Sequence, residues 1–319
     1  MNTPHIAIIV LHYKNLDDTR ACLASLEKID YQHYSVIVVN NDAHEHGDNL
    51  KREFPDITLI QNVSNVGFAE GNNVGIRAAL KNDRTDAVLI LNNDTEVEPG
   101  FLSAMTNVRG DMIAARMMQY NDRNNVDNLG VVIMKSGLAF NRLDEKQKLF
   151  CPSAGCALYS RKLLEAVAYE RDGTQYYFDR TYFAYAEDVD LGFRARLLGF
   201  EPGYAQGAIV YHKGSASSSK LSEFAVYNTY RNLMWTQYKN YPASLFLQNI
   251  FWIILGWKLI FWGYVFKGRP RIIARAIFDG LAGLSVMKRK RAEIQKKRAI
   301  DCRTMRSWFE SGLFPKNLL

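Results

Sequence analysis

Residues 1 to 100 alternate short apolar runs with segments of helical spacing, and this alternation constrains the fold more than any other feature. The apolar runs cover 5–11, 35–40, 57–61 and 87–91. Near-continuous runs of this kind are typical of strands that are buried on both faces of a parallel sheet. The segments between them, 17–29, 48–54 and 70–82, are predicted helices, of which the middle one is short and polar. This order predicts an α/β fold with a doubly wound sheet.

Polar side chains follow each of the four apolar runs. Tyr13 comes shortly after the first run, Asn40 ends the second, Asn65 follows the third, and Asn93 and Asp94 follow the fourth. In doubly wound sheets, ligands bind outside the carboxyl ends of the strands. We therefore expect a crevice at this edge of the sheet, lined by side chains that suit a sugar, a phosphate or a metal.

The segment NVGFAEGNNVG, residues 65–75, combines three Gly with three Asn. Gly67, Gly71 and Gly75 recur every four residues, which allows a helix to pack closely on the sheet while the Asn amides face the crevice. The alternative is a flexible phosphate-binding loop, but the spacing G-x-G-x-x-G is absent from this segment.

Three acidic residues, Glu187, Asp188 and Asp190, fall in the first turn of a helix predicted over 187–198. The helix dipole favours carboxylates there, so simple N-terminal capping is the alternative to a functional role, above all for Asp190. Glu187 and Asp188 follow the aromatic run YFDRTYFAYA. A carboxylate kept ionised by a helix N-terminus can accept a proton from a hydroxyl, so the pattern favours a catalytic role for these two.

Asp94 and His212 are candidate metal ligands. A carboxylate at a strand end can hold Mg²⁺ or Mn²⁺ against a diphosphate. His212 ends a strand predicted over 208–212, and its neutral imidazole could complete the metal shell. The alternatives are a turn with an N-cap at Asp94 and a structural role for His212. Gly155, in the segment SAGCALYS, is a candidate for the wall on the acceptor side.

Positive charge is concentrated at the end of the chain. Residues 267–319 contain fourteen Lys and Arg against four Asp and Glu, a balance of +10, which leaves −3 for the rest of a chain of net charge +7. Before this tail, 221–242 is a predicted amphipathic helix, and 243–266 is apolar and long enough to cross a bilayer.

Lys258 lies well inside the apolar segment 243–266, which also contains three Trp. A lysine there costs about 2.5–3.5 kcal/mol on insertion scales. We therefore expect a helix that lies in the membrane interface, followed by basic segments held to anionic lipid. A buried helix in a soluble C-terminal subdomain is the alternative.

Composition limits the remaining classes. The four Cys show neither a CxxC pair nor metal-ligand spacing, and the first residues lack the pattern of a signal peptide, so we expect reduced thiols in a cytoplasmic protein. The basic residues are interleaved with apolar helix rather than with a base-stacking platform. Nucleic acid is therefore a poor candidate partner.

Six motifs occur in the order VIVVNND, NVGFAEGNNVG, LILNNDTEVEPGFL, SAGCALYSRK, YFAYAEDVDLGFRARLLGF and AIVYHKGSAS. Over about residues 5–241 the chain resembles the inverting family-two glycosyltransferases with a GT-A fold, and it looks most like the bacterial branch that builds rhamnose-containing and related surface polysaccharides. The resemblance implies a GT-A catalytic domain over 1–216, with a nucleotide-sugar half (1–111) and an acceptor half with a smaller sheet (112–216). A helical, basic, membrane-associating region would follow over 217–319.

The resemblance also implies roles for the reactive residues. Asp94 matches the last position of the family's metal-binding DxD element, with Asn92 where the first Asp often stands, and His212 matches a metal-binding His. Asp188 matches the catalytic base, and Glu187 precedes it. Matches to the substrate sites are Tyr13 and Asn40 for the base and ribose, Asn65, Gly67, Asn72 and Asn93 near the nucleotide, and Gly155 and Asp190 on the acceptor side.

By this resemblance, the expected reaction uses a divalent Mn or Mg ion and moves a sugar from a nucleotide sugar to a lipid-linked saccharide at the inner face of the cell membrane, in O-antigen, capsule or cell-wall synthesis. The expected donor is dTDP-rhamnose, and UDP-linked galactose, glucose or galactofuranose stay open. A nucleotidyltransferase is a second class, although no basic triphosphate loop is visible. A third class is an inactive membrane-bound scaffold, and the tail could also dock on a partner subunit to give a homo-oligomer.

Overall fold

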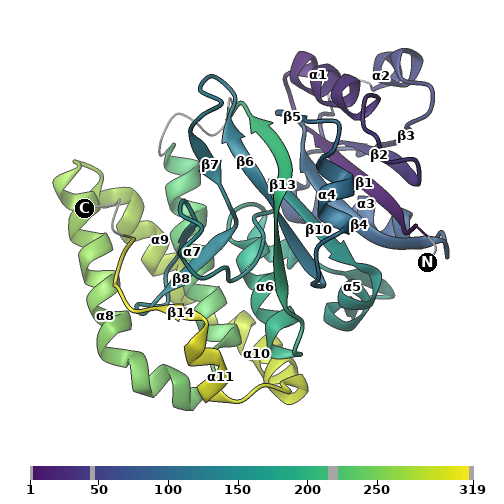
Figure 1. Ribbon diagram of the computed structural model, residues 1–319. Helices are drawn as coiled ribbons and strands as arrows, with labels where there is room; N and C mark the ends of the chain where they lie inside the picture. Colours follow the sequence, from purple (N-terminus) through teal and green to yellow (C-terminus); the bar gives the residue numbers. More distant parts are fainter. Residues whose placement is uncertain (1–2, 44–46, 215–221, 316–319) are drawn as a thin grey trace.

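The computed structural model describes residues 3–43, 47–214 and 222–315. Its first part is the predicted alternation of strands and helices (Figure 1). The elements are β1 (His5–His12), α1 (Leu16–Leu26), β2 (Tyr34–Asn40), α2 (Asp48–Glu53), β3 (Thr58–Gln61), α3 (Gly67–Leu80) and β4 (Thr85–Asn92). Strands β3, β2, β1 and β4 are neighbours in that order and run parallel. The doubly wound arrangement predicted from the apolar runs is therefore confirmed.

The second part of the chain extends the same sheet. Its elements are β5 (Thr95–Val97), α4 (Phe101–Thr106), β6 (Met112–Gln119), β7 (Val126–Asn128), β8 (Val131–Met134), β9 (Ala139–Asn141), β10 (Cys156–Ser160), α5 (Arg161–Val167), β11 (Tyr169–Arg171), β12 (Thr174–Tyr176), the 3-10 turn η1 (Arg180–Tyr182), α6 (Glu187–Leu197) and β13 (Pro202–His212). The sheet continues from β4 through β10, β6 and β13 to β5, with β7 beside β6. Because β10 is antiparallel to both β4 and β6, the full sheet is mixed.

Strand β13 is longer than the predicted strand over 208–212. Its first residues pair with β6, and the register shifts between Ala205 and Ile209. Gly203 and Gly207 interrupt the apolar pattern in this stretch, so the run of apolar residues is too short to mark the whole strand. The end of the strand, at His212, agrees with the prediction.

The two faces of the sheet bury separate cores. Ile6, Ile8 and Val10 of β1 pack with residues of α1 and α4, whereas the alternate residues Ala7 and Ile9 pack with residues of α3 and α6. Successive side chains of a strand point to opposite faces, so a continuous apolar run serves both cores. This is the reason why the first strands show no polar alternation.

Helix α3 lies unusually close to β1. A Cβ atom at Gly71 would come within 2.5 Å of Leu11 Cδ1, and one at Gly75 within 2.6 Å of Ile9 Cγ2. Real Cβ atoms do not approach heavy atoms this closely, so these two positions need Gly. The close packing predicted from the four-residue spacing is confirmed.

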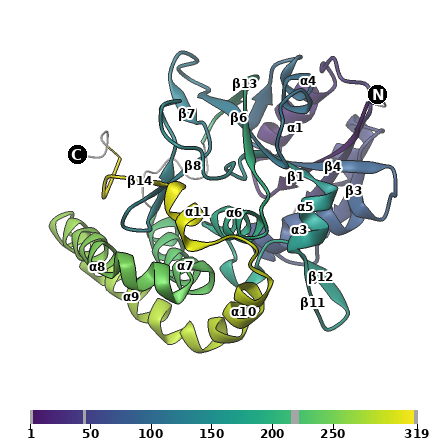
Figure 2. The same ribbon diagram turned by 60° about the horizontal axis from the view of Figure 1, so that its bottom comes forward.

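The C-terminal helices pack against the sheet domain. They are α7 (Glu223–Asn240), α8 (Ala243–Phe266), α9 (Pro270–Ala282), α10 (Leu284–Lys297) and α11 (Cys302–Ser307), followed by β14 (Phe309–Glu310). Figure 2 shows α7, α8 and α9 on the side of the molecule away from α1 and α4. Strand β14 pairs with β8 in a three-stranded sheet with β9, so the chain returns to the acceptor half. The predicted boundary at 216/217 lies outside the described residues.

Helix α8 matches the apolar segment predicted over 243–266. It is the one helix within the described ranges that is long and apolar enough to cross a membrane, which is weak evidence for a span. One of its faces, with Leu245, Ile253 and Ile260, is buried against the protein. Its other face exposes large apolar side chains, so α8 is not a fully buried core helix.

Candidate active site

A cavity of about 840 Å³ opens where the carboxyl ends of β1 and β4 face the beginning of α6. Nine of the predicted site residues line it: Tyr13, Asn65, Gly67, Asn93, Asp94, Gly155, Glu187, Asp188 and His212. They come from segments spread over two hundred residues of the sequence. The structure therefore brings the predicted nucleotide, metal and catalytic residues to one site.

Three predicted residues are not among the described residues that line this cavity. Asn40 is buried, and its Nδ2 donates to Gln61 Oε1 at 2.8 Å. Asn72 is buried on α3 and donates to the carbonyl oxygen of Phe68 at 2.9 Å. Asp190 is fully buried on the side of α6 that faces the core. The strand end and the two helix faces turn these side chains inward, so their contacts with nucleotide or acceptor stay predictions.

Asn41 takes the place expected for Asn40 in the cavity wall. Its Nδ2 donates to Asn65 Oδ1 at 2.9 Å, and its Oδ1 accepts from Asn62 Nδ2 at 3.1 Å. Asn65 Oδ1 also accepts from the backbone N–H of Gly67 at 2.9 Å. This chain of amides shapes the loop before α3. Asn40 and Asn41 are adjacent at the end of β2, but Asn40 points inward and Asn41 lines the cavity.

Asp94 and His212 face each other across the ends of β4 and β13. Asp94 Oδ1 lies 3.3 Å from His212 Nε2, and His212 Nδ1 lies 2.9 Å from Asp127 Oδ2. Burial lowers the pKa of His212, but the hydrogen bonds to Asp127 and Asp94 outweigh it and raise the pKa to about 10. The site thus stabilises positive charge beside Asp94.

This donor set fits a divalent ion. A carboxylate oxygen and an imidazole nitrogen 3.3 Å apart can both contact one Mn²⁺ or Mg²⁺, and a second carboxylate on the other ring nitrogen is the usual support of a ligating His. No group of three or more His, Cys, Asp or Glu in the described part of the chain is arranged to hold a metal. Asp94 and His212 would therefore hold the ion together with oxygens from a bound substrate and water.

Glu187 and Asp188 face the cavity from the first turn of α6. Asp188 Oδ2 accepts from the backbone N–H of Ala154 at 3.1 Å, and Oδ1 accepts from that of Val189 at 2.7 Å. Burial raises the pKa of Asp188 although both N–H groups oppose the shift. An aspartate that is oriented by the backbone and has a raised pKa is suited to accept a proton.

Glu187 is 5% exposed, and its Oε2 has no hydrogen-bond partner among the described residues. Burial raises the pKa of Glu187 well above its usual range, and repulsion from Asp188 adds to the shift. Burial and this repulsion therefore favour the neutral form of its side chain. A neutral acid can donate a hydrogen bond into the cavity, where an ionised one could only accept.

The loop before α6 is strained. Phe183, Tyr185 and Ala186 have φ of 62°, 71° and 62°, although none of them is Gly. Such conformations cost on the order of 1–3 kcal/mol each and cluster at functional sites. The first turn of α3 supports them: the backbone N–H of Ala69 donates to the carbonyl oxygen of Phe183 at 3.0 Å. A Cβ at Gly67 would come within 2.6 Å of Phe183, so this contact needs Gly.

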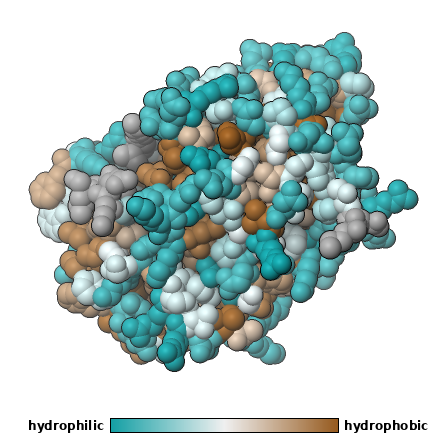
Figure 3. All heavy atoms as spheres, viewed as in Figure 1, coloured by the Kyte–Doolittle hydropathy of each residue, from teal (hydrophilic) through white to brown (hydrophobic). Residues whose placement is uncertain are grey.

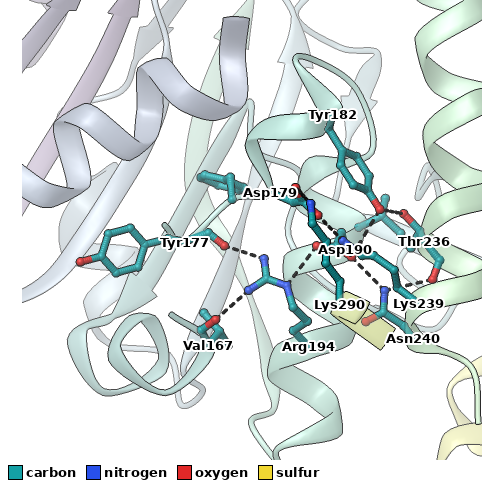
Figure 4. Close-up of polar contacts among 12 residues, drawn as sticks. Val167, Tyr177, Asp179, Tyr182, Asp190, Arg194, Thr236, Lys239, Asn240 and Lys290 are labelled. Carbon is teal, nitrogen blue, oxygen red and sulfur yellow. Dashed lines mark hydrogen bonds and ion pairs between the residues drawn. The ribbon is translucent and has the colours of Figure 1, made fainter. Parts of the chain in front are cut away.

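Asp190 belongs to a buried ion cluster behind the cavity (Figure 4). It lies 3.0 Å from Arg194 Nε and 2.9 Å from Lys239 Nζ. Lys239 also lies 2.6 Å from Asp179, which Lys290 approaches at the same distance. Burial alone would raise the pKa of Asp190, but Lys239 and Arg194 outweigh it and lower the pKa. The cluster joins α6 to α7 and α10.

The sequence around Asp127 and Lys239 gives no indication of the residues that they contact. Asp127 contacts His212 across 85 positions of the chain, and Lys239 contacts Asp179 across 60. Only the pairing of β7 with β6, and the packing of α7 against α6 and the residue before η1, brings these partners together. Asn41 did have a signal, because it stands beside Asn40 at the same strand end.

Comparison with known proteins agrees with this geometry. The model of the family described as glycosyltransferase like family 2 matches residues 4–233. The chain is 22% identical over 296 residues to the low-salt glycan biosynthesis hexosyltransferase Agl10 of Haloferax volcanii, which covers 88% of this chain and 91% of that protein.

Two solved structures have a similar fold. S. aureus TarS 1-349 gives a TM-score of 0.51 at 17% identity, over 73% of this chain and 65% of that one. GalNAc-T7, solved with UDP, GalNAc and Mn²⁺, gives 0.52 at 10% identity, over 66% and 43%. In both cases the chain spans less than two thirds of the solved structure, and the likeness shows the GT-A-like fold alone. Since the family model covers more than half of the chain, the protein belongs to the glycosyltransferase like family 2.

Proposed function

We propose that the protein transfers a hexose from a nucleoside-diphosphate sugar to a hydroxyl of a glycan, with inversion at the anomeric carbon. The observation that carries this proposal is that one cavity is lined by two residues suited to bind a metal ion, Asp94 and His212, and by Asp188, whose carboxylate is oriented by backbone N–H groups. Agl10 is named as a hexosyltransferase of glycan biosynthesis, and GalNAc-T7 was solved with UDP and Mn²⁺, which supports the same class of donor.

The donor would lie along the carboxyl ends of β1 and β4. Tyr13 is 41% exposed and offers its ring to a base, while Asn65 and Asn93 line the same wall. Asn93 Nδ2 donates to Thr19 Oγ1 at 2.9 Å, which fixes its amide. As the donor we propose dTDP-rhamnose, with UDP-hexose and UDP-galactofuranose as alternatives, and the test below separates the dTDP-linked donor from the UDP-linked ones.

Asp188 would act as the base in a single displacement. The acceptor oxygen forms a bond to C1, the bond from C1 to the diphosphate breaks, and the hydroxyl proton moves to Asp188. The N–H groups of Ala154 and Val189 keep the carboxylate turned to the cavity. A divalent ion held by Asp94 and His212 would supply the positive charge that stabilises the leaving diphosphate.

The first test is a thermal-shift panel of UDP, dTDP, GDP and CDP, each with and without Mn²⁺. A ligand that binds only the folded protein raises the midpoint by mass action. We expect a Mn²⁺-dependent shift with one nucleotide, and the Asp94→Asn variant should lose this shift when it is measured against the variant's own ligand-free midpoint. If none of the four nucleotides shifts the midpoint, the enzyme proposal is refuted and the scaffold alternative is favoured.

We infer that the acceptor is anchored in a membrane, because α8 exposes a large apolar face. Leu247, Phe251 and Phe266 are 70%, 64% and 85% exposed. Figure 3 shows hydrophobic residues gathered at the lower left, where Figure 1 places α8. The exposed cations Lys258 and Lys267 lie on or next to the same helix. This combination suits an anionic surface such as the inner face of a cell membrane.

Vesicle flotation tests the membrane proposal. We expect the protein to float with phosphatidylcholine vesicles that contain phosphatidylglycerol, and Phe251→Glu to reduce the bound fraction. Val63→Glu is the matched control, since Val63 is 93% exposed but lies in the N-terminal half. If the wild type stays unbound and elutes as a dimer, α8 is instead an interface between two copies.

A further inference from the structure

The strained loop 182–186 and the catalytic turn that follows it are held by a residue of the C-terminal helices. Asn232 lies on α7 and is fully buried. Its Nδ2 donates to the carbonyl oxygens of Tyr182, Ala184 and Tyr185 at 3.0, 2.9 and 2.7 Å. The two N–H bonds of one amide group therefore serve three carbonyl oxygens, one N–H being shared, in a loop that local preferences disfavour.

The amide of Asn232 is itself held in place. Its Oδ1 accepts from Arg231 at 3.0 Å from Nε and at 2.9 Å from Nη2. Arg231 Nη2 also donates to the carbonyl oxygen of Tyr182 at 3.2 Å. Because Oδ1 of Asn232 accepts from Arg231, the Nδ2 group of Asn232 is the one that points at the loop.

Helix α7 holds the chain on both sides of Asp188. Asn232 binds the loop before it, and Lys239 binds Asp190, two residues after it. Asn232 and Lys239 are seven residues apart, about two turns of an α-helix, so they lie on the same face of α7. The base is thus fixed between two buried contacts that come from one helix outside the sheet domain.

We propose that Asn232 is a positioning residue for the reaction: it holds loop 182–186 in the conformation that turns Asp188 and Glu187 into the cavity. The proposal rests on the proposed glycosyl transfer for its effect on turnover, but the loop contact itself does not. Loss of the three hydrogen bonds frees the loop to relax toward unstrained φ values. A small displacement of a reacting group is enough to lower the rate by roughly 100-fold.

The test compares Asn232→Ala with Asn249→Ala. Asn249 is also a buried Asn on a C-terminal helix, but its Nδ2 donates to Leu245 of its own helix at 3.0 Å. With the donor found in the nucleotide panel, we expect Asn232→Ala to lower kcat by roughly 100-fold. The affinity for the nucleotide and Mn²⁺ should stay within a few-fold of the wild type, and the control should keep its kcat.

Hydrogen exchange separates this proposal from the proposed function. We expect the amides of 182–188 to exchange faster in Asn232→Ala and at the wild-type rate in Asn249→Ala, whether or not a donor is known. If the panel finds no donor but the loop exchanges faster, the proposed function fails and the loop contact stands. If exchange and kcat are both unchanged, the positioning role is refuted.

A rescue variant covers the case in which Asn232→Ala folds poorly. Gly adopts positive φ without strain, so Ala186→Gly in the Asn232→Ala background should recover part of kcat. Asn232→Ser keeps one donor and should fall between the wild type and Asn232→Ala. A uniform loss of stability in all of these variants, with kcat per folded molecule unchanged, would assign Asn232 a structural role alone.

Discussion

Asp188 and Asp190 are the same amino acid in the same turn of α6, and their surroundings are opposite. Asp188 faces the cavity, is held by two backbone N–H groups, and has a raised pKa because it is buried without a cation. Asp190 faces the core, and Lys239 and Arg194 overcome the effect of burial and lower its pKa. The first acid is poised to take up a proton, and the second is held ionised as part of the scaffold.

The contrast shows that a helix N-terminus does not decide what its carboxylates do. The dipole of α6 acts on both residues, yet the partners supplied by other elements determine the direction of each pKa shift. Asp188 receives only neutral donors from the loop before β10 and its own helix, whereas Asp190 receives cations from α6 and α7. Four experiments test this difference, in order of decreasing expected effect.

The largest effect is expected for Asp188→Asn. The amide keeps the shape but cannot accept a proton, so kcat should fall by about 10³- to 10⁴-fold. The free energy of unfolding should change little, because the gain from replacing a buried carboxyl that has no cation is offset by the loss of one of the two accepted backbone N–H bonds. Initial rates and urea denaturation check the two parts, and an active Asp188→Asn protein would contradict the assignment of the base.

Removal of the cation from the core-facing acid should destabilise the fold. Lys239 is 1% exposed and lies 2.6 Å from Asp179 and 2.9 Å from Asp190. Lys239→Met leaves these carboxylates with fewer buried cations and should lower the free energy of unfolding by about 3 kcal/mol. Lys81→Met, at an exposed position, should change it by less than about 0.5 kcal/mol in the same urea titration.

Activity and stability should be lost at different pH values. The pKa of Asp188 is raised above the ordinary Asp value of about 3.9. Once the pH falls below this raised pKa, kcat should fall about tenfold for each further pH unit. The lowered pKa of Asp190 contributes stability that is present above about pH 3.9 and is lost only as pH falls further. Rate profiles and denaturation at each pH check this, and a single shared midpoint would argue against the comparison.

The smallest effect is expected for Glu187→Gln. Burial raises the pKa of Glu187 well above its usual range and so favours its neutral form, and Gln keeps its length and a hydrogen-bond donor. We expect kcat to fall by less than about 10-fold, in contrast to Asp188→Asn. A loss as large as that of Asp188→Asn would show that Glu187 works as an ionised group.

Much of the fold and part of the site could be predicted from the sequence. The apolar runs located the first four strands, and the polar residues after them located Tyr13, Asn93 and Asp94 in the cavity. His212 was found because it ends the last strand of the sheet. These predictions succeed because the carboxyl ends of parallel strands meet at one edge, so a local pattern reports a shared position.

Other residues take positions that the sequence does not indicate, because orientation or a distant partner decides them. Asn40 and Asn41 differ by one position, and the end of β2 turns the first inward and the second to the cavity. Asn72 lies on the buried face of α3, where helix rotation rather than spacing sets its direction. Asp127 lies beside His212 because β7 pairs with β6.

The sequence by itself determined the order of strands and helices, the edge of the sheet where the cavity lies, and the family. Hydrophobic periodicity and the polarity of strand ends are local patterns, so they can be recognised in the sequence without knowledge of tertiary contacts. Only the tertiary structure decided which acid of α6 faces the cavity, which cation neutralises the other, and that Asn232 of α7 holds the loop before them. These choices depend on contacts between residues that are about 45 to 60 positions apart, and such contacts exist only once the helices have packed.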